Sequence, residues 1–275
     1  MKGRKNLISN ILLLICIAVF LGSGGVLAYK IVGQKKNDGR LEDLSSLVDN
    51  ELEADSTNET EEKAGGNESR SQENNGAKVQ AMREARVKAY QKIKEENGDL
   101  VGWIKIEGTK IDYPVLQTPD NPNFYLKHDF DKNPSSYGAP YVAEECDLSA
   151  DCKNIIVYGH HMKNGSMFAG LEDYLDQEFQ KAHPVIQFDT LKEYGDYQVM
   201  GIFSMSAVEQ ANPLYDWITA GTEEAFNEYV AYVRQHSVYA TGVDAEWGDH
   251  LLSLITCEYT HKDGRLIVVA KKVEE

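Results

Sequence analysis

The chain is poor in cysteine, with four in 275 residues, and no two of them form a Cys-x-x-Cys pair. A dense disulfide framework, a zinc ribbon and a thioredoxin-like redox motif are therefore not indicated. Cys16 lies in an apolar segment, Cys146 and Cys152 share a polar loop, and Cys257 stands alone at the end of an apolar run. We expect Cys146 and Cys152, which five residues separate, to be free thiols, and a disulfide between them is the alternative.

Basic residues are also in short supply, because 28 Lys and Arg face 44 Asp and Glu, which gives a formal net charge of −16. Phosphate contacts need clustered Lys and Arg, so nucleic acid is not expected as a partner. Acidity of this kind keeps a protein soluble and carries no information about its fold. The sequence contains no internal repeat.

One long apolar run is present, from Ile11 to about Val32, and three basic residues precede it. The run is long enough to cross a bilayer as a helix, and basic residues before it favour an N-terminus on the inside. We therefore predict a single-pass membrane anchor over residues 1–36, with the rest of the chain outside the cytoplasm. Two alternatives are a signal-peptidase site at Val26–Ala28 and a lipoprotein box at Leu13–Cys16, in which Ile15 is too large for its position.

Residues 37–77 have few apolar groups and are rich in Glu, Asp, Asn, Ser and Gly. Such a composition cannot bury enough surface to offset the entropy of ordering the chain. We predict a flexible, disordered acidic spacer here, which would hold one folded domain, residues 78–275, away from the membrane. This remainder of the chain is long enough for a domain with a substantial core.

The folded domain is predicted to consist mainly of short strands. Apolar residues recur at helical spacing from Lys78 to Glu96, Asn97-Gly98 ends that helix, and Glu223–Gln235 is the second predicted long helix. Turn signals separate seven apolar runs that are typical of strands. These are Lys110–Val115, Ala139–Val142, Asn154–Tyr158, Val185–Asp189, Tyr197–Ser204, Leu251–Cys257 and Leu266–Lys271. Many short strands with few helices predict a mainly β fold, a barrel or a sandwich, with helical insertions.

Three of these strands end or begin at residues that can do chemistry. The strand Asn154–Tyr158 runs through a glycine into His160 and His161, and another strand ends at Cys257. Arg265 opens the last strand, and an Asp-Gly pair just before it favours a turn. The last two strands could then pair as a hairpin, which would place Cys257 and Arg265 side by side.

A cysteine, a histidine and an arginine together permit acyl transfer. A thiolate attacks a carbonyl, a histidine protonates the leaving amine and deprotonates the acceptor, and a fixed guanidinium stabilises the oxyanion or holds the substrate backbone. From residue type alone, a lone cysteine such as Cys257 is usually a small core residue, and either histidine is more often structural than catalytic. A metal site made of the two loop cysteines and the two histidines matches no standard zinc pattern.

The order and spacing of several motifs resemble the sortases of class B, over about residues 80–273. The segments that carry the resemblance are Tyr158–Met162, Leu254–Glu258, Arg265, Ile111–Gln117, Asp120–Leu126, Gly165–Phe168 and Phe188-Asp189. The helix Glu223–Gln235 falls where class B inserts one between two late strands, and the helix at 78–96 matches its N-terminal helical extension. Each motif is weak alone, whereas their order and spacing together are specific.

The resemblance implies an eight-stranded sortase β-barrel and a transpeptidation reaction. Such enzymes cut a C-terminal sorting signal after its Thr, hold the acyl group as a thioester and pass it to an amine of the cell wall. His160 matches the catalytic histidine, Cys257 the nucleophile and Arg265 the catalytic arginine of the family. The expected partners are surface proteins that bear a sorting signal and a peptidoglycan precursor or another cell-wall amine, and no cofactor or metal is expected.

The resemblance also implies substrate-binding residues. Thr256 and Glu258 match positions that line the substrate groove, Leu126 matches a residue of the groove wall, and Asn121 matches a polar neighbour. Ile255 stands where the family often has a small polar residue, which affects the substrate pocket rather than the reaction.

The segment before the late helix, residues 207–222, forms one wall of the groove in the resembling family. Here it carries three large apolar side chains, those of Leu214, Tyr215 and Trp217. These side chains either pack the helix onto the barrel or contact the Pro of a sorting signal, because Pro is preset in an extended conformation and stacks well on such surfaces. Leu214 and Tyr215 are therefore further substrate-binding candidates.

Other classes fit the sequence less well. In an L,D-transpeptidase the cysteine follows a Gly and is trailed almost immediately by an Arg, whereas here Thr256 precedes Cys257 and Arg265 is eight positions on. A papain-like peptidase places its Cys before its His, the reverse of this chain. The non-enzymatic alternative is a membrane-tethered adhesion domain that has lost its chemistry, and the intact His160, Cys257 and Arg265 argue against it.

Overall fold

The structure is a computed structural model in which the chain forms two units, Met1–Glu42 and Asp43–Glu275. It describes residues 2–58, 70–206, 217, 220–258 and 264–273. Helix α1 runs over Lys2–Asn58 and so supplies the first unit and the beginning of the second. Among the residues whose side chains the structure describes, which exclude most of residues 1–30, no helix combines the length and the apolar content that crossing a bilayer requires.

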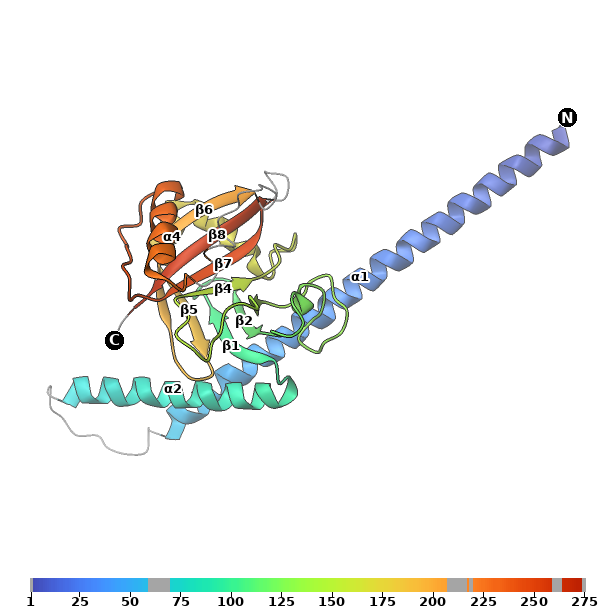
Figure 1. The fold of residues 1–275 in the computed structure, drawn as a ribbon. Coiled ribbons are helices and arrows are strands. Elements are labelled where there is room, and N and C mark those ends of the chain that lie inside the picture. Colours follow the sequence, from blue (N-terminus) through green and yellow to red (C-terminus); the bar gives the residue numbers. More distant parts are fainter. Residues whose placement is uncertain (1, 59–69, 207–216, 218–219, 259–263, 274–275) are drawn as a thin grey trace. The chain divides into compact units, whose positions relative to one another are not determined.

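Eight strands close into a barrel among the described residues of the second unit, which confirms the predicted eight-stranded fold (Figure 1). They are β1 (Leu100–Lys105), β2 (Asp112–Leu116), β3 (Tyr141–Val142), β4 (Asn154–Tyr158), β5 (Val185–Thr190), β6 (Asp196–Ser206), β7 (Leu251–Glu258) and β8 (Gly264–Lys272). Around the barrel the order is β1-β2-β3-β4-β7-β8-β6-β5, and β5 pairs with β1 to close it. The β2–β3 and β4–β7 pairs are parallel, and the other pairs are antiparallel.

Strand β1 was not predicted, because Gly102 interrupts a short apolar run that alone signals a strand only weakly. Its neighbours explain the glycine. A Cβ atom at Gly102 would lie 2.3 Å from the backbone oxygen of Asp189 in β5, so only a residue without a side chain lets β1 and β5 approach this closely.

Helices pack on the outside of the barrel and carry the remaining predicted elements. Helix α2 (Arg70–Glu96) starts earlier than predicted and ends before Asn97-Gly98. Helix α4 (Glu223–His236) begins at Thr222, whose side chain accepts a hydrogen bond from the backbone N–H of Ala225. Its buried face consists of Phe226, Tyr229, Val230 and Val233. The short helices η2 (Phe124–Leu126), η3 (Phe168–Leu175) and α3 (Gln177–Ala182) were not predicted, because helices of three to eight residues carry little periodicity.

Parts of the predicted spacer, residues 37–77, are helical in the structure, because α1 continues to Asn58 and α2 begins at Arg70. In the second unit, Leu44 and Val48 lie one helical turn apart and join the core cluster around Tyr90, Ile93 and Trp103. The composition argument averaged these apolar residues with their polar neighbours and so missed a narrow apolar stripe. Residues 59–69 of the predicted spacer lie outside the described part of the chain.

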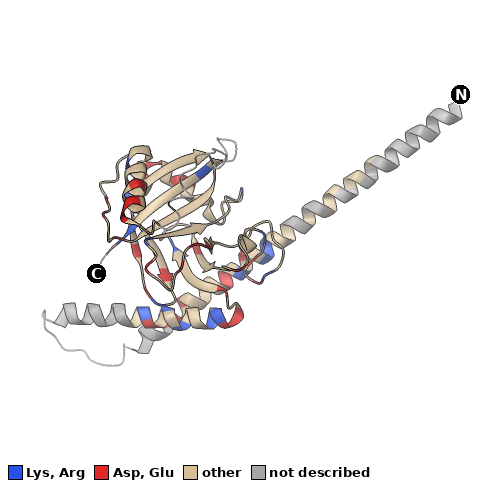
Figure 2. Cartoon of the chain, viewed as in Figure 1, with Lys and Arg blue, Asp and Glu red and all other residues tan. Residues whose placement is uncertain are grey.

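Charged residues of both signs are interspersed over the described part of the barrel in the view of Figure 2. The excess of acidic residues is thus spread over several elements there rather than gathered on one strand or helix. Such mixed surfaces favour solubility.

Candidate active site

The topology brings the ends of three strands together at one edge of the barrel. Because β4 and β7 are parallel neighbours, their carboxyl ends meet. His160 follows β4 there, and Cys257 is the last residue but one of β7. Strand β8 starts at the same edge, and its Arg265 lies directly opposite Cys257 in the antiparallel register. The predicted hairpin between Cys257 and Arg265 is confirmed, and β4 brings His160 to it.

The imidazole of His160 and the thiol of Cys257 perturb each other. A hydrogen bond between the two side chains raises the pKa of His160 above its usual range, and the same bond lowers the pKa of Cys257. The positive charge of Arg265 lowers the pKa of Cys257 further, against the effect of burial. The pair is therefore biased toward thiolate and imidazolium, the reactive form of a cysteine nucleophile.

The orientation of the His160 ring follows from its second contact. Its Nε2 atom lies 2.7 Å from the backbone oxygen of Leu126. A carbonyl oxygen only accepts, so Nε2 carries a hydrogen and donates it, which leaves Nδ1 as the nitrogen that exchanges a proton with Cys257.

Two glycines let the backbone fit around His160. A Cβ atom at Gly159 would lie 2.5 Å from the ring of Phe168. At Gly138, where φ is +59°, a Cβ atom would lie 2.5 Å from the backbone oxygen of Tyr125 and 3.0 Å from the ring of His160. Larger residues at either position would displace the histidine or its support.

His160, Cys257 and Arg265 line a cavity of about 200 Å³. Leu126 and Thr256, two of the predicted substrate-binding residues, also line it. The hydroxyl oxygen of Thr256 is buried and, within the described structure, has no hydrogen-bond partner. This cavity is where a peptide would meet the thiol.

Other predicted substrate-binding residues are placed differently. Asn121 is exposed and does not line the cavity, whereas Asn123, two positions later, does. The backbone of Glu258 pairs with Gly264 at the strand ends, and its side chain is outside the description. Leu214 and Tyr215 lie outside the described residues, so their contact with a peptide stays a prediction.

Trp217 packs against the late helix, as one of the two predicted roles requires. It is buried, its ring centroid lies 5.6 Å from that of Tyr229 and 5.0 Å from that of Tyr232, and its Nε1 donates to Glu228 at 3.4 Å. All three partners belong to α4. Trp217 therefore holds the late helix in place.

Several cavity residues were missed by sequence reasoning. They are Asn123, Ala139, Tyr141, Glu144, Glu145 and Tyr158. Tyr158 directly precedes the Gly159-His160 pair and could have been found from that position. The others come from loops and a two-residue strand whose path depends on the closed barrel, so no local pattern announces them.

The two loop cysteines lie together but apart from the catalytic pair. The Sγ atoms of Cys146 and Cys152 approach the backbone oxygen of Asn154 at 3.6 and 3.3 Å, and both residues are free thiols. A hydrogen bond between these thiols raises the pKa of Cys146 and lowers that of Cys152. Among the described residues, no three His, Cys, Asp or Glu side chains gather as metal ligands.

Comparisons with known proteins agree with this geometry. Residues 104–273 match the family described as the Sortase domain. The chain is 30% identical to Sortase B of Listeria monocytogenes over 273 residues, which is 98% of each chain. It is 32% identical to Sortase B of Staphylococcus aureus over 187 residues, 67% of this chain and 75% of the other.

Solved structures give the same result. The sortase B–substrate complex of S. aureus superposes with a TM-score of 0.61 at 30% identity, and the match covers 68% of this chain and 85% of that chain. Sortase B of Clostridium perfringens superposes with a TM-score of 0.60 at 33% identity and covers 67% and 99%.

Fold and site together define a β-barrel cysteine transpeptidase. The chain belongs to the sortase family, and within it to class B.

Proposed function

We propose that this sortase cleaves a C-terminal sorting signal after its Thr through a thioester on Cys257 and transfers the acyl group to a cell-wall amine. One observation carries the assignment of roles: the thiol of Cys257, the ring of His160 and the guanidinium of Arg265 line one small cavity, in which the pKa of the thiol is lowered. A binding domain without chemistry has no need of a depressed thiol pKa.

In the first half of the reaction, the Cys257 thiolate attacks the carbonyl carbon of the Thr, and a C–S bond forms. The carbonyl oxygen becomes an oxyanion, which the Arg265 guanidinium stabilises by charge and hydrogen bonds. When the tetrahedral intermediate collapses, the C–N bond breaks and protonated His160 gives its proton to the leaving amine. The products are the thioester and a neutral His160.

In the second half, an amine of the cell wall attacks the thioester carbonyl and His160 accepts the proton that the amine loses. The C–S bond breaks, the new amide leaves, and the thiolate–imidazolium pair is restored. The raised pKa of His160 and the lowered pKa of Cys257 suit this cycle, because the pair returns to its charged form without a proton from solvent.

The proposed substrates place the catalytic domain outside the cytoplasm, on a single-pass anchor. The apolar run Ile11–Val32, with basic residues before it, supports the anchor, and sorting signals and wall amines are available only on the outer face. Substrate recognition would fall to the walls of the cavity, which Leu126, Asn123 and Thr256 help to line.

The test is to incubate the full chain with a small library of sorting-signal peptides and to follow cleavage. Mass spectrometry of the denatured mixture should find an acyl adduct on the peptide that contains Cys257. The Cys257→Ala variant should be folded, as judged by its melting temperature, and should cleave none of the peptides. An adduct on another cysteine, or cleavage by Cys257→Ala, would refute the assignment. Labelling of Cys257 by a thiol reagent without loss of cleavage would do the same.

A further inference from the structure

Strand β4 is too short to pair with the end of β7. Their parallel register stops at Tyr158 and Ile255, and the last backbone bond runs from the N–H of Gly159 to the oxygen of Ile255, at 3.0 Å. Carbonyls of alternate residues in a strand point to the same edge, so the oxygen of Cys257 faces the place where β4 would have continued. A backbone acceptor at this position needs a donor from elsewhere.

The ring of His161 supplies that donor. Its Nδ1 atom lies 3.2 Å from the backbone oxygen of Cys257, and the carbonyl can only accept. Its Nε2 atom lies 3.4 Å from Oε2 of Glu172, which belongs to η3. The His161 side chain is 14% exposed, whereas that of Glu172 is 55% exposed, so the ring is enclosed and the carboxylate borders solvent.

Both histidines are held by one short arch between β4 and η3. The backbone oxygen of His160 accepts from the N–H of Phe168 at 2.9 Å, and His161 forms an isolated antiparallel bridge with Met167. The arch thus fixes two adjacent imidazole rings, and both rings contact Cys257. His160 contacts the thiol of Cys257, and His161 contacts its carbonyl.

We propose that His161 is a positioning residue for acyl transfer, which replaces the missing continuation of β4 and fixes the backbone of Cys257. When the ring carries a proton on each nitrogen, its Nε2 also donates to Glu172, which then fixes the ring of His161. The inference rests on the nucleophilic role of Cys257 proposed above. Without His161, the end of β7 is held on this side only up to Ile255, and the sulfur shifts relative to His160 and Arg265.

Substitution of His161 should therefore reduce the chemical step and spare peptide binding. We expect His161→Ala to lower kcat by about 10- to 10²-fold, the effect of a displacement on the order of 1 Å, with KM changed by less than about two-fold. His161→Asn should recover most of kcat, because the amide Nδ2 of Asn occupies the place of the imidazole Nδ1. The substrate is the library peptide that the wild-type chain cleaves fastest.

A second readout separates alignment from thiolate supply. The rate at which iodoacetamide alkylates Cys257, followed on its peptide by mass spectrometry, should fall far less than kcat in His161→Ala, by no more than about two-fold. A small electrophile needs the thiolate but not its alignment with Arg265. A parallel loss of alkylation and kcat would overturn the inference, since His161 would then act on the protonation of the thiol.

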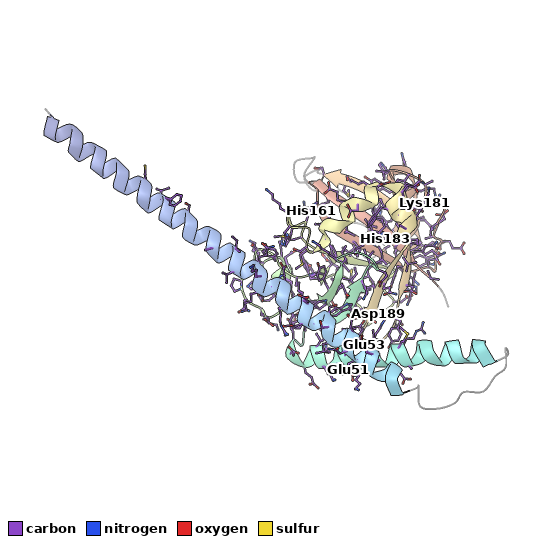
Figure 3. All side chains as sticks on the ribbon, turned by 180° about the vertical axis from the view of Figure 1, so that it is seen from behind. Glu51, Glu53, His161, Lys181, His183 and Asp189 are labelled. Carbon is purple, nitrogen blue, oxygen red and sulfur yellow. The ribbon has the colours of Figure 1, made fainter. Side chains whose placement is uncertain are left out.

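The matched control removes a similar bond elsewhere. His183 also places Nδ1 against a backbone oxygen, that of Glu107, at 2.8 Å, and it lies at the end of α3; both histidines are labelled in Figure 3. His183→Ala should keep the wild-type kcat.

If His161→Ala does not fold, Glu172→Gln, which keeps the side-chain size, should show a smaller loss of kcat in the same direction. Wild-type kcat in both variants, or an Asn variant no better than Ala, would overturn the positioning role. Activity of Cys257→Ala would instead overturn the proposed function.

Discussion

Two regions of the barrel hold ionisable side chains away from solvent, and the pKa shifts in the two regions have different causes. At the ends of β4, β7 and β8, His160 and Cys257 shift each other's pKa inside a cavity of about 200 Å³. Beneath α2, Asp189 is only 3% exposed, and burial raises its pKa. A larger hollow of about 710 Å³ adjoins Asp189 and contains none of the three catalytic candidates.

The partners of Asp189 explain the contrast. Tyr90 Oη donates to it at 2.8 Å, Arg86 at 3.3 Å and the backbone N–H of Gly195 at 3.3 Å, which ties α2 to β5 (Figure 3). None of these donors exchanges a proton near neutral pH, so this cluster serves to hold elements together. At the strand ends, each shift arises from another group that can exchange a proton. In this barrel, the shifts at the strand ends arise first from a titrating partner, whereas that of Asp189 arises first from burial.

The largest effect is expected at Arg265. Arg265→Lys keeps the charge near Cys257 but loses the planar fork of donors, so kcat should fall by about 10²-fold or more, as on removal of an oxyanion donor. Steady-state cleavage of the best library peptide measures this loss. Turnover near the wild-type level would mean that Arg265 acts through charge alone, and the distinction between the two regions would then rest on His160 and Cys257.

Asp189 should behave in the opposite way. Asp189→Ala leaves Tyr90 and Arg86 without their acceptor, so the free energy of unfolding should fall by about 1–3 kcal/mol, while kcat of the folded protein stays within about two-fold. Chemical denaturation and peptide cleavage on the same preparation measure both quantities. A loss of kcat without a loss of stability would contradict the structural role of this cluster.

The pH dependence of Cys257 alkylation sharpens the electrostatic side of the comparison. Because the pKa of Cys257 is lowered, its thiolate persists at pH values at which an ordinary thiol, with a pKa of about 8.5, is already protonated. His160→Ala removes the first cause of this shift, so the midpoint of the alkylation rate should move to higher pH. A midpoint that does not move would assign the shift to Arg265 instead.

The raised pKa of His160 predicts the matching limit on catalysis. The productive form needs a deprotonated Cys257 and a protonated His160, so it is depleted at both low and high pH and kcat/KM should be bell-shaped. In His160→Ala the alkaline limb that belongs to the histidine should disappear from the residual activity.

The smallest effect is expected at Thr256. Its buried hydroxyl lacks a partner in the described structure, so Thr256→Val, which replaces the hydroxyl with a methyl group, should raise the free energy of unfolding by about 1 kcal/mol. We expect kcat/KM to change by less than about two-fold, because the oxygen has no exposed surface through which to reach a peptide. A clear loss of kcat/KM would show that the hydroxyl turns toward the substrate on binding.

Sequence reasoning succeeded where a signal was local. The Asp-Gly pair before Arg265 predicted the β7–β8 register that sets Arg265 opposite Cys257, and the apolar runs predicted every strand except β1. The pairing of β4 with β7 is non-local, and only the family resemblance brought His160 to Cys257. Asn123, rather than the predicted Asn121, lines the cavity. Its backbone is left-handed (φ 58°), a conformation that residue spacing does not encode.

The parallel contact between β4 and β7 has a consequence for how the enzyme matures. His161 and Cys257 are 96 residues apart, so the strands that carry the histidines and the cysteine are among the long-range contacts of the chain. Contacts between such distant segments require costly loop closure and slow the folding of a β-barrel. Until the C-terminal hairpin joins β4, Cys257 has neither His160 nor a fixed backbone and remains an ordinary, largely protonated thiol. In a newly made chain the thiol is thereby kept from attacking peptide carbonyls of its own or neighbouring chains, and reactivity begins only with closure of the barrel.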